Sequence, residues 1–369
     1  MKPLFQNAYG ERNVLVTGHT GFKGSWLTSW LVDLGANVCG YSIGIPTTPS
    51  LFEAAGLGDE IRHEVGDIRD LDRISWIIRD FRPDFIFHLA AQAIVSVSYA
   101  NPLETLGVNV LGTATVLEAL RRIDWPCVAV IITSDKVYDN VEWPWGYRET
   151  DRLGGKDIYS ASKGGAELAF YSYFHSFFSK SGLPLRVATT RAGNVIGGGD
   201  WAADRIVADC IRAWKDGRCV DIRSPNATRP WQHVLEPLSG YLTLASKLVK
   251  DQSLHGESFN FGPRAEQNAT VLELLSSLAE VWGSNKYASS YNVIGNSPFH
   301  ESSLLKLNID KALLRLRWEP TLSYEECMTM TGVWYRDVVT RGRSAREMTK
   351  TQIRNYVLEA ERTQRTWTL

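Results

Sequence analysis

Short apolar runs and longer amphipathic segments alternate along the first half of the chain. The apolar runs predict strands over 13–17, 37–41, 61–65, 84–89, 128–132 and 185–192. Apolar residues at helical spacing predict helices over 22–34, 71–80, 104–122 and 158–178. Because strands that alternate with helices form parallel sheets covered on both faces, the pattern predicts an α/β protein with a doubly wound parallel sheet. Ligands of such sheets bind at the carboxyl ends of the strands.

The alternation ends after Gly193, where loops rich in glycine, proline and tryptophan begin. This change in composition predicts a second, smaller C-terminal lobe that binds the substrate. We expect a cofactor-binding domain at 1–194, a return of the chain to it around 231–262, the smaller lobe at 195–230 and 263–340, and a helical tail at 341–369. The return includes a predicted strand at 258–261, and the lobe includes a predicted helix at 271–282.

The tail is charged, and its apolar residues Ile353, Tyr356, Val357 and Ala360 lie at helical spacing. Such a stripe has to be covered by another surface. Either the tail packs on its own subunit, or it contacts a second subunit of a homo-oligomer, which we expect to be a dimer or a tetramer.

Composition narrows the class of protein. The 369 residues carry 40 Lys and Arg against 41 Asp and Glu, so no net charge attracts nucleic acid or an anionic membrane. The N-terminus lacks an apolar signal core, and no later stretch reaches the roughly 20 apolar residues of a spanning helix. Five scattered cysteines form no C-x-x-C pair, which argues against a metal site. We expect a cytoplasmic protein.

Three glycines, Gly18, Gly21 and Gly24, separate the first predicted strand from the first predicted helix. A tight turn without side chains lets the pyrophosphate of a dinucleotide reach the helix N-terminus. The three-and-three spacing is typical of short-chain dehydrogenase-like proteins, so we expect a Rossmann-type domain that binds NAD. Residues 42–48 offer neither the carboxylate expected for NAD nor an arginine for the NADP phosphate. The expected cofactor contacts are Gly18, Gly21, Phe22, Lys23, Gly24, Asp67, Ile68, Leu89, Ala90, Ala91, Gln92, Tyr159 and Lys163.

Tyr159 and Lys163 are four residues apart and share one helix face. A neighbouring ammonium stabilises a phenolate, so we expect Lys163 to lower the pKa of Tyr159. Ser134, at the end of the 128–132 strand, can bind the same substrate hydroxyl. The three residues together suit removal of a hydroxyl proton while hydride leaves the adjacent carbon.

Asp135 and Lys136 follow Ser134 directly. Once a sugar hydroxyl has been oxidised to a ketone, the proton on the next carbon becomes acidic. A base can remove that proton while an acid protonates the hydroxyl one carbon further, and water leaves. Asp135 and Lys136 can supply this acid and base, or they form a simple ion pair at the strand end.

At these residues the chain resembles the extended short-chain dehydrogenase/reductase family, in its sugar nucleotide 4,6-dehydratase branch. The similarity includes 17–26, 191–201 and 229–234, and lysine at 136, where most of these dehydratases carry glutamate, resembles the branch acting on CDP-glucose. The resemblance implies bound NAD, oxidation of carbon 4, loss of water across carbons 5 and 6, and hydride return to carbon 6, in lipopolysaccharide O-antigen biosynthesis. It implies substrate contacts for Asn194, Arg205, Arg229 and His300.

Three positions depart from the pattern of those dehydratases. Ser96 stands where an arginine is usual, Leu106 where a tyrosine is frequent, and Gly44 where Asp or Asn is frequent. The sugar and the nucleotide therefore stay open. A 4-epimerase is an alternative, because it needs Ser134, Tyr159, Lys163 and NAD but not Asp135 and Lys136. A dinucleotide-sensing regulator without catalysis is a further alternative.

Overall fold

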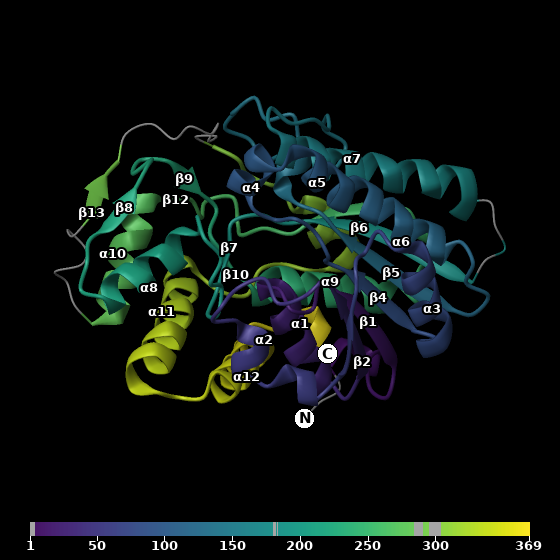
Figure 1. Ribbon diagram of the computed structural model, residues 1–369, viewed down its shortest axis with the longest axis horizontal. Coiled ribbons are helices and arrows are strands. Elements are labelled where there is room, and N and C mark those ends of the chain that lie inside the picture. The colour runs from purple at the N-terminus through teal and green to yellow at the C-terminus, as the bar shows by residue number, and fades with distance from the viewer. Residues whose placement is uncertain (1–3, 180–181, 183, 284–290, 295–303) are drawn as a thin grey trace.

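A seven-stranded parallel sheet forms the centre of the computed structural model, which describes residues 4–179, 182, 184–283, 291–294 and 304–369 (Figure 1). The strands lie in the order β11-β6-β5-β4-β1-β2-β3. Their bounds are β1 Asn13–Thr17, β2 Asn37–Ser42, β3 Arg62–Val65, β4 Phe85–His88, β5 Cys127–Ile132, β6 Leu185–Arg191 and β11 Ser258–Asn260. All neighbouring strands pair in parallel, so the predicted doubly wound α/β sheet is confirmed.

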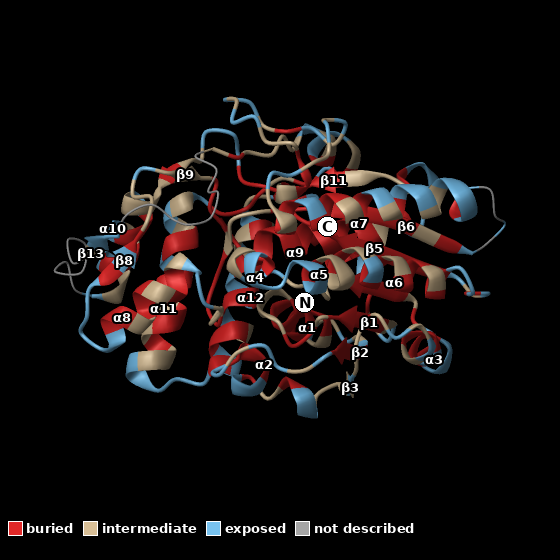
Figure 2. Ribbon diagram, turned by 45° about the horizontal axis from the view of Figure 1, so that its top comes forward, coloured by how far each residue is buried: buried red, intermediate tan, exposed pale blue. Residues whose placement is uncertain are grey.

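Helices cover both faces of this sheet, and the strands bury side chains on both (Figure 2). Leu15 packs in one core cluster with α3 (Leu71–Phe81), α6 (Gly112–Leu120) and α7 (Ile158–Tyr173). Its neighbours Val14 and Val16 pack in the other cluster with α1 (Phe22–Asp33) and α9 (Leu235–Leu248). Alternation along a strand sends successive side chains to opposite faces, which is why the strands read as unbroken apolar runs.

The helix predicted over 104–122 is not continuous. It consists of α5 (Pro102–Leu106), a π-helical turn at Gly107–Leu111 and α6. The turn contains buried Asn109, whose Nδ2 donates to the carbonyl oxygen of Gln92 at 3.0 Å and to Oγ of Ser162 at 2.8 Å. These contacts and the two flanking glycines, which are poor helix formers, account for the interruption. The helix predicted to reach 178 ends as α7 at Tyr173, followed by another π turn at Phe174–Phe178.

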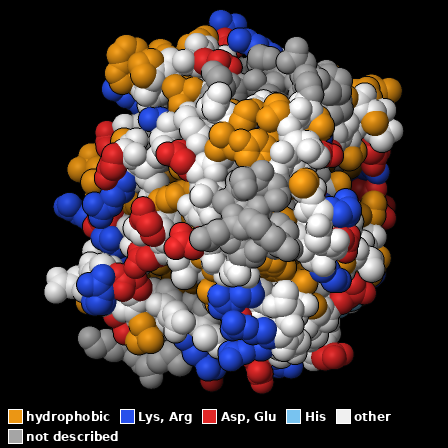
Figure 3. Space-filling model, turned by 90° about the vertical axis from the view of Figure 1, so that its left-hand side faces the viewer, with side chains coloured by type: hydrophobic (Ala, Val, Ile, Leu, Met, Phe, Trp, Pro, Cys, Tyr) orange, Lys and Arg blue, Asp and Glu red, His pale blue; other side chains and the backbone are white. Residues whose placement is uncertain are grey.

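The remaining elements gather beside the sheet, at the left of Figure 1. They include the helices α8 (Ile206–Lys215), α10 (Val271–Trp282) and α11 (Tyr324–Arg341), and the strand pairs β7 (Val195–Ile196) with β10 (Gln232–His233), β8 (Val220–Ile222) with β13 (Tyr291–Val293), and β9 (Thr228–Arg229) with β12 (Ala269–Thr270). Short helices α2 (Leu51–Ala54) and α4 (Val95–Ala100) flank the sheet. Charges of both signs are interspersed over this end of the molecule (Figure 3). The domain boundaries themselves stay a prediction.

The C-terminal tail forms α12 (Ala345–Arg362), which packs on α1 of its own subunit. Ile353, Tyr356, Val357 and Ala360 are all buried there. Tyr356 meets Trp30 of α1 edge-on at 5.8 Å between ring centroids. The first of the two interpretations of this stripe is therefore confirmed.

Candidate active site

The order of the sheet strands reverses beside β1, and the glycine turn lies at this point. Gly18 has φ +76°, and a Cβ atom there would lie 2.6 Å from the backbone nitrogen of Ala90. A Cβ at Gly24 would overlap the carbonyl oxygen of Gly18. Gly21 is the N-cap of α1 and offers no side chain, so the first N–H groups of this 12-residue helix are not capped by one. A turn of this shape fits the pyrophosphate of a dinucleotide.

Several residues predicted to contact the cofactor form hydrogen bonds with, or pack against, other residues of the protein. The carboxylate of Asp67 accepts hydrogen bonds from the backbone and guanidinium of Arg69, which hold its pKa below the usual range. Ile68 is buried in the core. The amide of Gln92 donates to Oγ1 of Thr105 at 2.9 Å, and its oxygen accepts from the backbone of Ile94 at 2.6 Å. Contacts of these residues with a cofactor therefore stay predictions, and Gln92 has a structural role that the sequence did not indicate.

The last two residues of β2, Tyr41 and Ser42, carry no charge at the place where an adenosine ribose is expected. Ser42 Oγ lies 2.9 Å from Nδ1 of His19, and Nε2 of His19 lies 2.7 Å from Nδ1 of His63. Burial and the neighbouring His63 lower the pKa of His19 to about 3, so this imidazole is neutral at pH 7. The end of β2 thus offers no cation for the 2′-phosphate of NADP.

Ser134 and Tyr159 meet where β5 ends and α7 begins. Ser134 caps a 3₁₀ turn at Asp135–Val137, accepting from the backbone N–H of Lys136 at 3.2 Å. The first turn of α7 is fixed by Asp157, whose carboxylate accepts from the backbone of Ser160 at 2.9 Å. The Ser134 side chain lies close enough to the Tyr159 hydroxyl to lower its pKa. The structure therefore brings two of the predicted reacting groups together.

Asp135 is buried against Gly193, a residue that no sequence pattern indicated. A Cβ atom at Gly193 would overlap the Asp135 carboxylate, so only glycine fits there. One carboxylate oxygen accepts from Ser134 Oγ at 2.9 Å, and the other lies 3.4 Å from Nδ2 of Asn194. Asn194 has φ +52°, a conformation that asparagine adopts more easily than most residues. The turn after β6 is thus shaped around this carboxylate.

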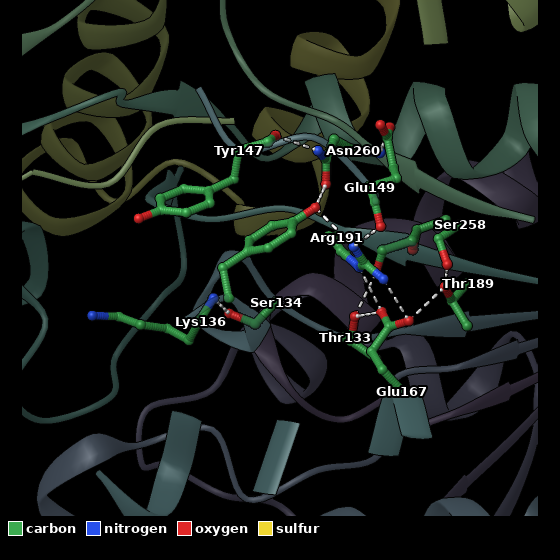
Figure 4. A network of polar contacts seen from close by, with 12 residues as sticks. Thr133, Ser134, Lys136, Tyr147, Glu149, Glu167, Thr189, Arg191, Ser258 and Asn260 are labelled. Carbon is green, nitrogen blue, oxygen red and sulfur yellow. Dashed lines mark hydrogen bonds and ion pairs between the residues drawn. The ribbon is translucent and has the colours of Figure 1, made fainter. Parts of the chain in front are cut away.

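Lys136 has different surroundings from Asp135. Its side chain points away from the buried pair of Arg191 and Glu167 (Figure 4). It lines a small cavity together with Asn140, Asp157 and Ser160, beside the start of α7. Asp135 and Lys136, both among the described residues, form no ion pair. The interpretation of these residues as a simple ion pair is therefore wrong.

The pKa of Tyr159 shifts in the direction opposite to the one predicted from the sequence. Burial raises its pKa, and the Arg205 guanidinium and the Ser134 hydroxyl only partly counteract this effect. Burial also lowers the pKa of Lys163 to about 8, assisted by repulsion from Lys23. The predicted lowering of the Tyr159 pKa by Lys163 is thus wrong for this structure, because desolvation outweighs the nearby positive charges.

A buried polar network lies beside the turn at Ser134–Val137 (Figure 4). Glu167, one helical turn beyond Lys163, forms a buried ion pair with Arg191 at 3.0 Å. Arg191 donates to the Tyr138 hydroxyl at 2.8 Å, and that hydroxyl donates to Oδ1 of Asn260 at 2.8 Å. The network ties α7, β6, β11 and the turn after β5 together, which fixes the relative positions of the candidate reacting groups. Its only sequence signal was the position of Glu167 four residues after Lys163.

The predicted substrate residues are spread over the facing loops. Arg229 donates to the backbone oxygen of Thr228 at 2.8 Å. Arg205 donates to the backbone oxygen of Ala93 at 3.1 Å and acts on the pKa of Tyr159. His300 lies outside the described residues. Asn194 and Arg205 therefore reach the groups around Tyr159 and Asp135, whereas Arg229 lies on β9.

Comparisons with known proteins identify the family of the chain. A family model described as GDP-mannose 4,6 dehydratase matches residues 15–331. The chain belongs to this family. Its relatives include the CDP-glucose 4,6-dehydratase of Salmonella typhimurium, which is 42% identical over 355 residues that cover 95% of this chain and 98% of the relative. The CDP-paratose 2-epimerase of Salmonella typhi is 26% identical, covering 85% of this chain and 96% of that one.

Solved structures of similar proteins share the fold. DesIV, a dTDP-glucose 4,6-dehydratase from Streptomyces venezuelae with NAD and TYD bound, has a TM-score of 0.75 at 24% identity, covering 89% of this chain and 98% of that chain. The UDP-glucose 4-epimerase of Thermotoga maritima has a TM-score of 0.74 at 23% identity, covering 89% and 99%. Dehydratases and epimerases of the family thus have the same architecture, and the residues of the site have to distinguish them.

Proposed function

We propose that this protein catalyses the NAD-dependent 4,6-dehydration of CDP-D-glucose to CDP-4-keto-6-deoxy-D-glucose, as a hydro-lyase. The observation that carries the proposal is the buried Asp135 carboxylate, which packs against Gly193, accepts a hydrogen bond from Ser134 and lies near Tyr159. An epimerase needs no acid at this place. The 42% identity to a CDP-glucose 4,6-dehydratase over nearly the whole chain supports the choice of nucleotide and sugar.

In the first step, Tyr159 removes the proton of the carbon 4 hydroxyl while Ser134 hydrogen-bonds the same oxygen. NAD bound at the glycine turn would supply the group that takes up the hydride from carbon 4 and gives it back to carbon 6. The Lys163 ammonium, one turn from Tyr159, would hold its nicotinamide ribose. Charge on Arg205 favours the phenolate that this step requires.

In the second step, Lys136 removes the proton from carbon 5, which the carbon 4 ketone has made acidic. Asp135 donates a proton to the carbon 6 hydroxyl, and water leaves. The burial of Asp135 excludes bulk water from its carboxyl, and Ser134 and Asn194 orient it. Asn194, Arg205, Arg229 and His300 bind the substrate, with guanidinium and amide groups suited to its pyrophosphate.

A panel of nucleotide sugars tests this proposal. Purified protein with NAD is incubated with CDP-glucose, UDP-glucose, dTDP-glucose and GDP-mannose, and the products are analysed by mass spectrometry. We expect a 4-keto-6-deoxy product, one water lighter than the substrate, from CDP-glucose. Turnover of only one of the other nucleotide sugars would show that this compound, and not CDP-glucose, is the substrate. An epimer of unchanged mass would support the 4-epimerase instead.

We further propose that a second copy of the chain covers the apolar surface of α5, the π turn at Gly107–Leu111 and α7 in a homo-oligomer. Leu103 and Leu111 are 83% and 58% exposed, and Leu168 and Tyr171 are 56% and 62% exposed. The prediction that no stretch is long and apolar enough for a spanning helix is wrong for Pro102–Leu120, which meets both criteria. Half of this segment is buried in the subunit, as in the core helix of a globular protein, which favours a partner over a lipid environment. Leu168→Glu should yield monomers by light scattering, and a parent that is itself monomeric would contradict the proposal.

We place the reaction in the cytoplasm, where the nucleotide sugar would enter lipopolysaccharide O-antigen biosynthesis. A near-neutral balance of charges supports neither nucleic acid nor a membrane surface as a partner. Fractionation of the source cells tests the location, with recovery of the protein in the soluble cytoplasmic fraction as the expected result.

A further inference from the structure

Two hydrogen bonds join a segment beside the sheet to a segment of the smaller group of elements. On the sheet side lie residues 93–96, named the rim, which follow β4 and begin α4. On the other side lie residues 201–205, named the strap, which precede α8. Ser96 donates from Oγ to Oδ2 of Asp204 at 2.6 Å, and Arg205 donates from Nη2 to the carbonyl oxygen of Ala93 at 3.1 Å. The strap is thus tied to the rim by a side chain 108 positions away in sequence.

Both sides of this bridge are fixed to their own surroundings. The rim is held by Gln92, whose side-chain oxygen accepts from the backbone of Ile94 at 2.6 Å. The strap is held by Arg223, which donates to the second carboxylate oxygen of Asp204 at 2.6 Å. Asp204 has φ +59°, in the left-handed region that aspartate adopts more easily than most residues. The Ser96 and Arg223 contacts hold its carboxylate from two sides.

The strap includes Arg205, whose positive charge acts on Tyr159 in the candidate active site. The Arg205 guanidinium is the charged group that most favours the phenolate of Tyr159. The charged groups that face the tyrosine are Arg205, Asp135 and Asp157, with Lys163 on its own helix. The two aspartates raise the Tyr159 pKa, so Arg205 opposes both of them. The Arg205 guanidinium therefore partly offsets the effect of burial on the Tyr159 pKa.

We propose that the Ser96–Asp204 hydrogen bond is a clasp that ties the strap to the rim and keeps the Arg205 charge near Tyr159 during the oxidation of carbon 4. This inference rests on the proposed function. It makes Ser96 and Asp204 positioning residues, which act through Arg205 and do not touch the reacting atoms. Ser96 also stands where the dehydratases that the chain resembles usually carry an arginine, so in this chain a neutral hydroxyl holds the strap while Arg205 carries the charge.

The pH profile of turnover tests the clasp. The rate depends on the phenolate of Tyr159 and rises with pH through the pKa of that group. Loss of the clasp lets Arg205 move away, which raises the pKa. Ser96→Ala should therefore shift the midpoint of the acidic limb of kcat upward, by up to roughly one pH unit. Ser96→Thr keeps the hydroxyl and should restore the parent profile.

A matched control lies two residues along the same helix. The Ser98 hydroxyl donates to the backbone oxygen of Val95 at 2.7 Å, inside α4, and makes no contact with the strap. Ser98→Ala removes the same group from the same helix and should leave the midpoint unchanged. In an Arg205→Ala background, Ser96→Ala should add no further shift, because the residue through which it acts is already gone.

Hydrogen exchange of the full chain gives a readout that needs no substrate. Peptides that span the strap should exchange faster in Ser96→Ala than in the parent, and at the parent rate in Ser98→Ala. An unchanged pH midpoint in Ser96→Ala, or a rise in KM without a shift of the midpoint, would overturn the clasp. An unchanged exchange rate of the strap would also overturn it. Failure of the proposed function is distinguishable, since the parent itself would then form no 4-keto-6-deoxy product.

Discussion

Thr133 donates a hydrogen bond of 2.6 Å from Oγ1 to Oε1 of Glu167, and so joins the catalytic turn to α7. Thr133 directly precedes Ser134, and Glu167 follows Lys163 by one helical turn. The same carboxylate holds Arg191 in a pair whose side chains are 2% and 3% exposed. The separation of Ser134 from Tyr159 and Lys163 is therefore set by a buried ion pair and not by the helix alone.

Removal of one partner of the Glu167–Arg191 ion pair should lower the stability of the folded protein. Glu167→Gln leaves the Arg191 guanidinium buried without its counter-ion, and we expect a loss of about 3–5 kcal/mol in the free energy of unfolding. Glu118→Gln is the control, since Glu118 pairs with exposed Arg121 on α6 and should cost at most about 1 kcal/mol. Denaturant unfolding of both variants gives the comparison. Equal midpoints for both would contradict the role assigned to the buried pair.

Lys163 should destabilise the folded protein near neutral pH. Its pKa falls from 10.5 to about 8 in the folded state, so the unfolded chain binds more protons between these values. Stability attributable to this group therefore rises as pH increases from about 8 to 10.5, and below pH 8 the full cost applies. Lys163→Met should stabilise the protein at pH 7 by up to about 3 kcal/mol and abolish turnover. The difference in unfolding free energy from the parent should shrink towards pH 10, and a constant difference would refute the shift.

Tyr159→Phe removes the base for the oxidation of carbon 4 without disturbing the glycine turn. Turnover should fall by about 10²–10⁴, which is typical of a lost acid–base group. Affinity for NAD, measured by calorimetry, should stay at the parent value, because the expected ribose contact belongs to Lys163. Tyr171→Phe, on the exposed side of the same helix, should have parental activity. Near-parental turnover of Tyr159→Phe would remove this tyrosine from the mechanism.

Asp135→Asn and Lys136→Met should fail after the first hydride transfer. In a single turnover, absorbance of reduced cofactor should rise and persist, because the ketone forms at carbon 4 but water does not leave. The parent should show only a transient rise. Parental rates of product formation in both variants would favour the epimerase over the dehydratase.

The sheet was predictable because its strands are buried on both faces and therefore appear as unbroken apolar runs. The break at Gly107–Leu111 was not, since it depends on hydrogen bonds of Asn109 to Gln92 and Ser162, residues that are distant in sequence. Local periodicity carries no information on such contacts, and the pattern of 104–122 is that of one long helix.

The candidate site likewise has features that local sequence predicts and features that it does not. The positions of Ser134 and Tyr159 followed from a strand end and a helix start, and both elements formed near their predicted places. The cradle at Gly193 and the bond from Ser96 to Asp204 join segments brought together only by the complete fold. The pKa of Tyr159 was mispredicted because the sequence shows the charge of Lys163 but not the burial of the phenol.

The fate of the hydrogen on carbon 4 tests the central claim most directly. CDP-glucose labelled with deuterium at carbon 4 is converted by the parent enzyme, and the product is examined by NMR and mass spectrometry. We predict a 4-keto-6-deoxy sugar that has lost one water and carries the deuterium on carbon 6. Deuterium found on carbon 4 of a product of unchanged mass would contradict the dehydratase and identify an epimerase.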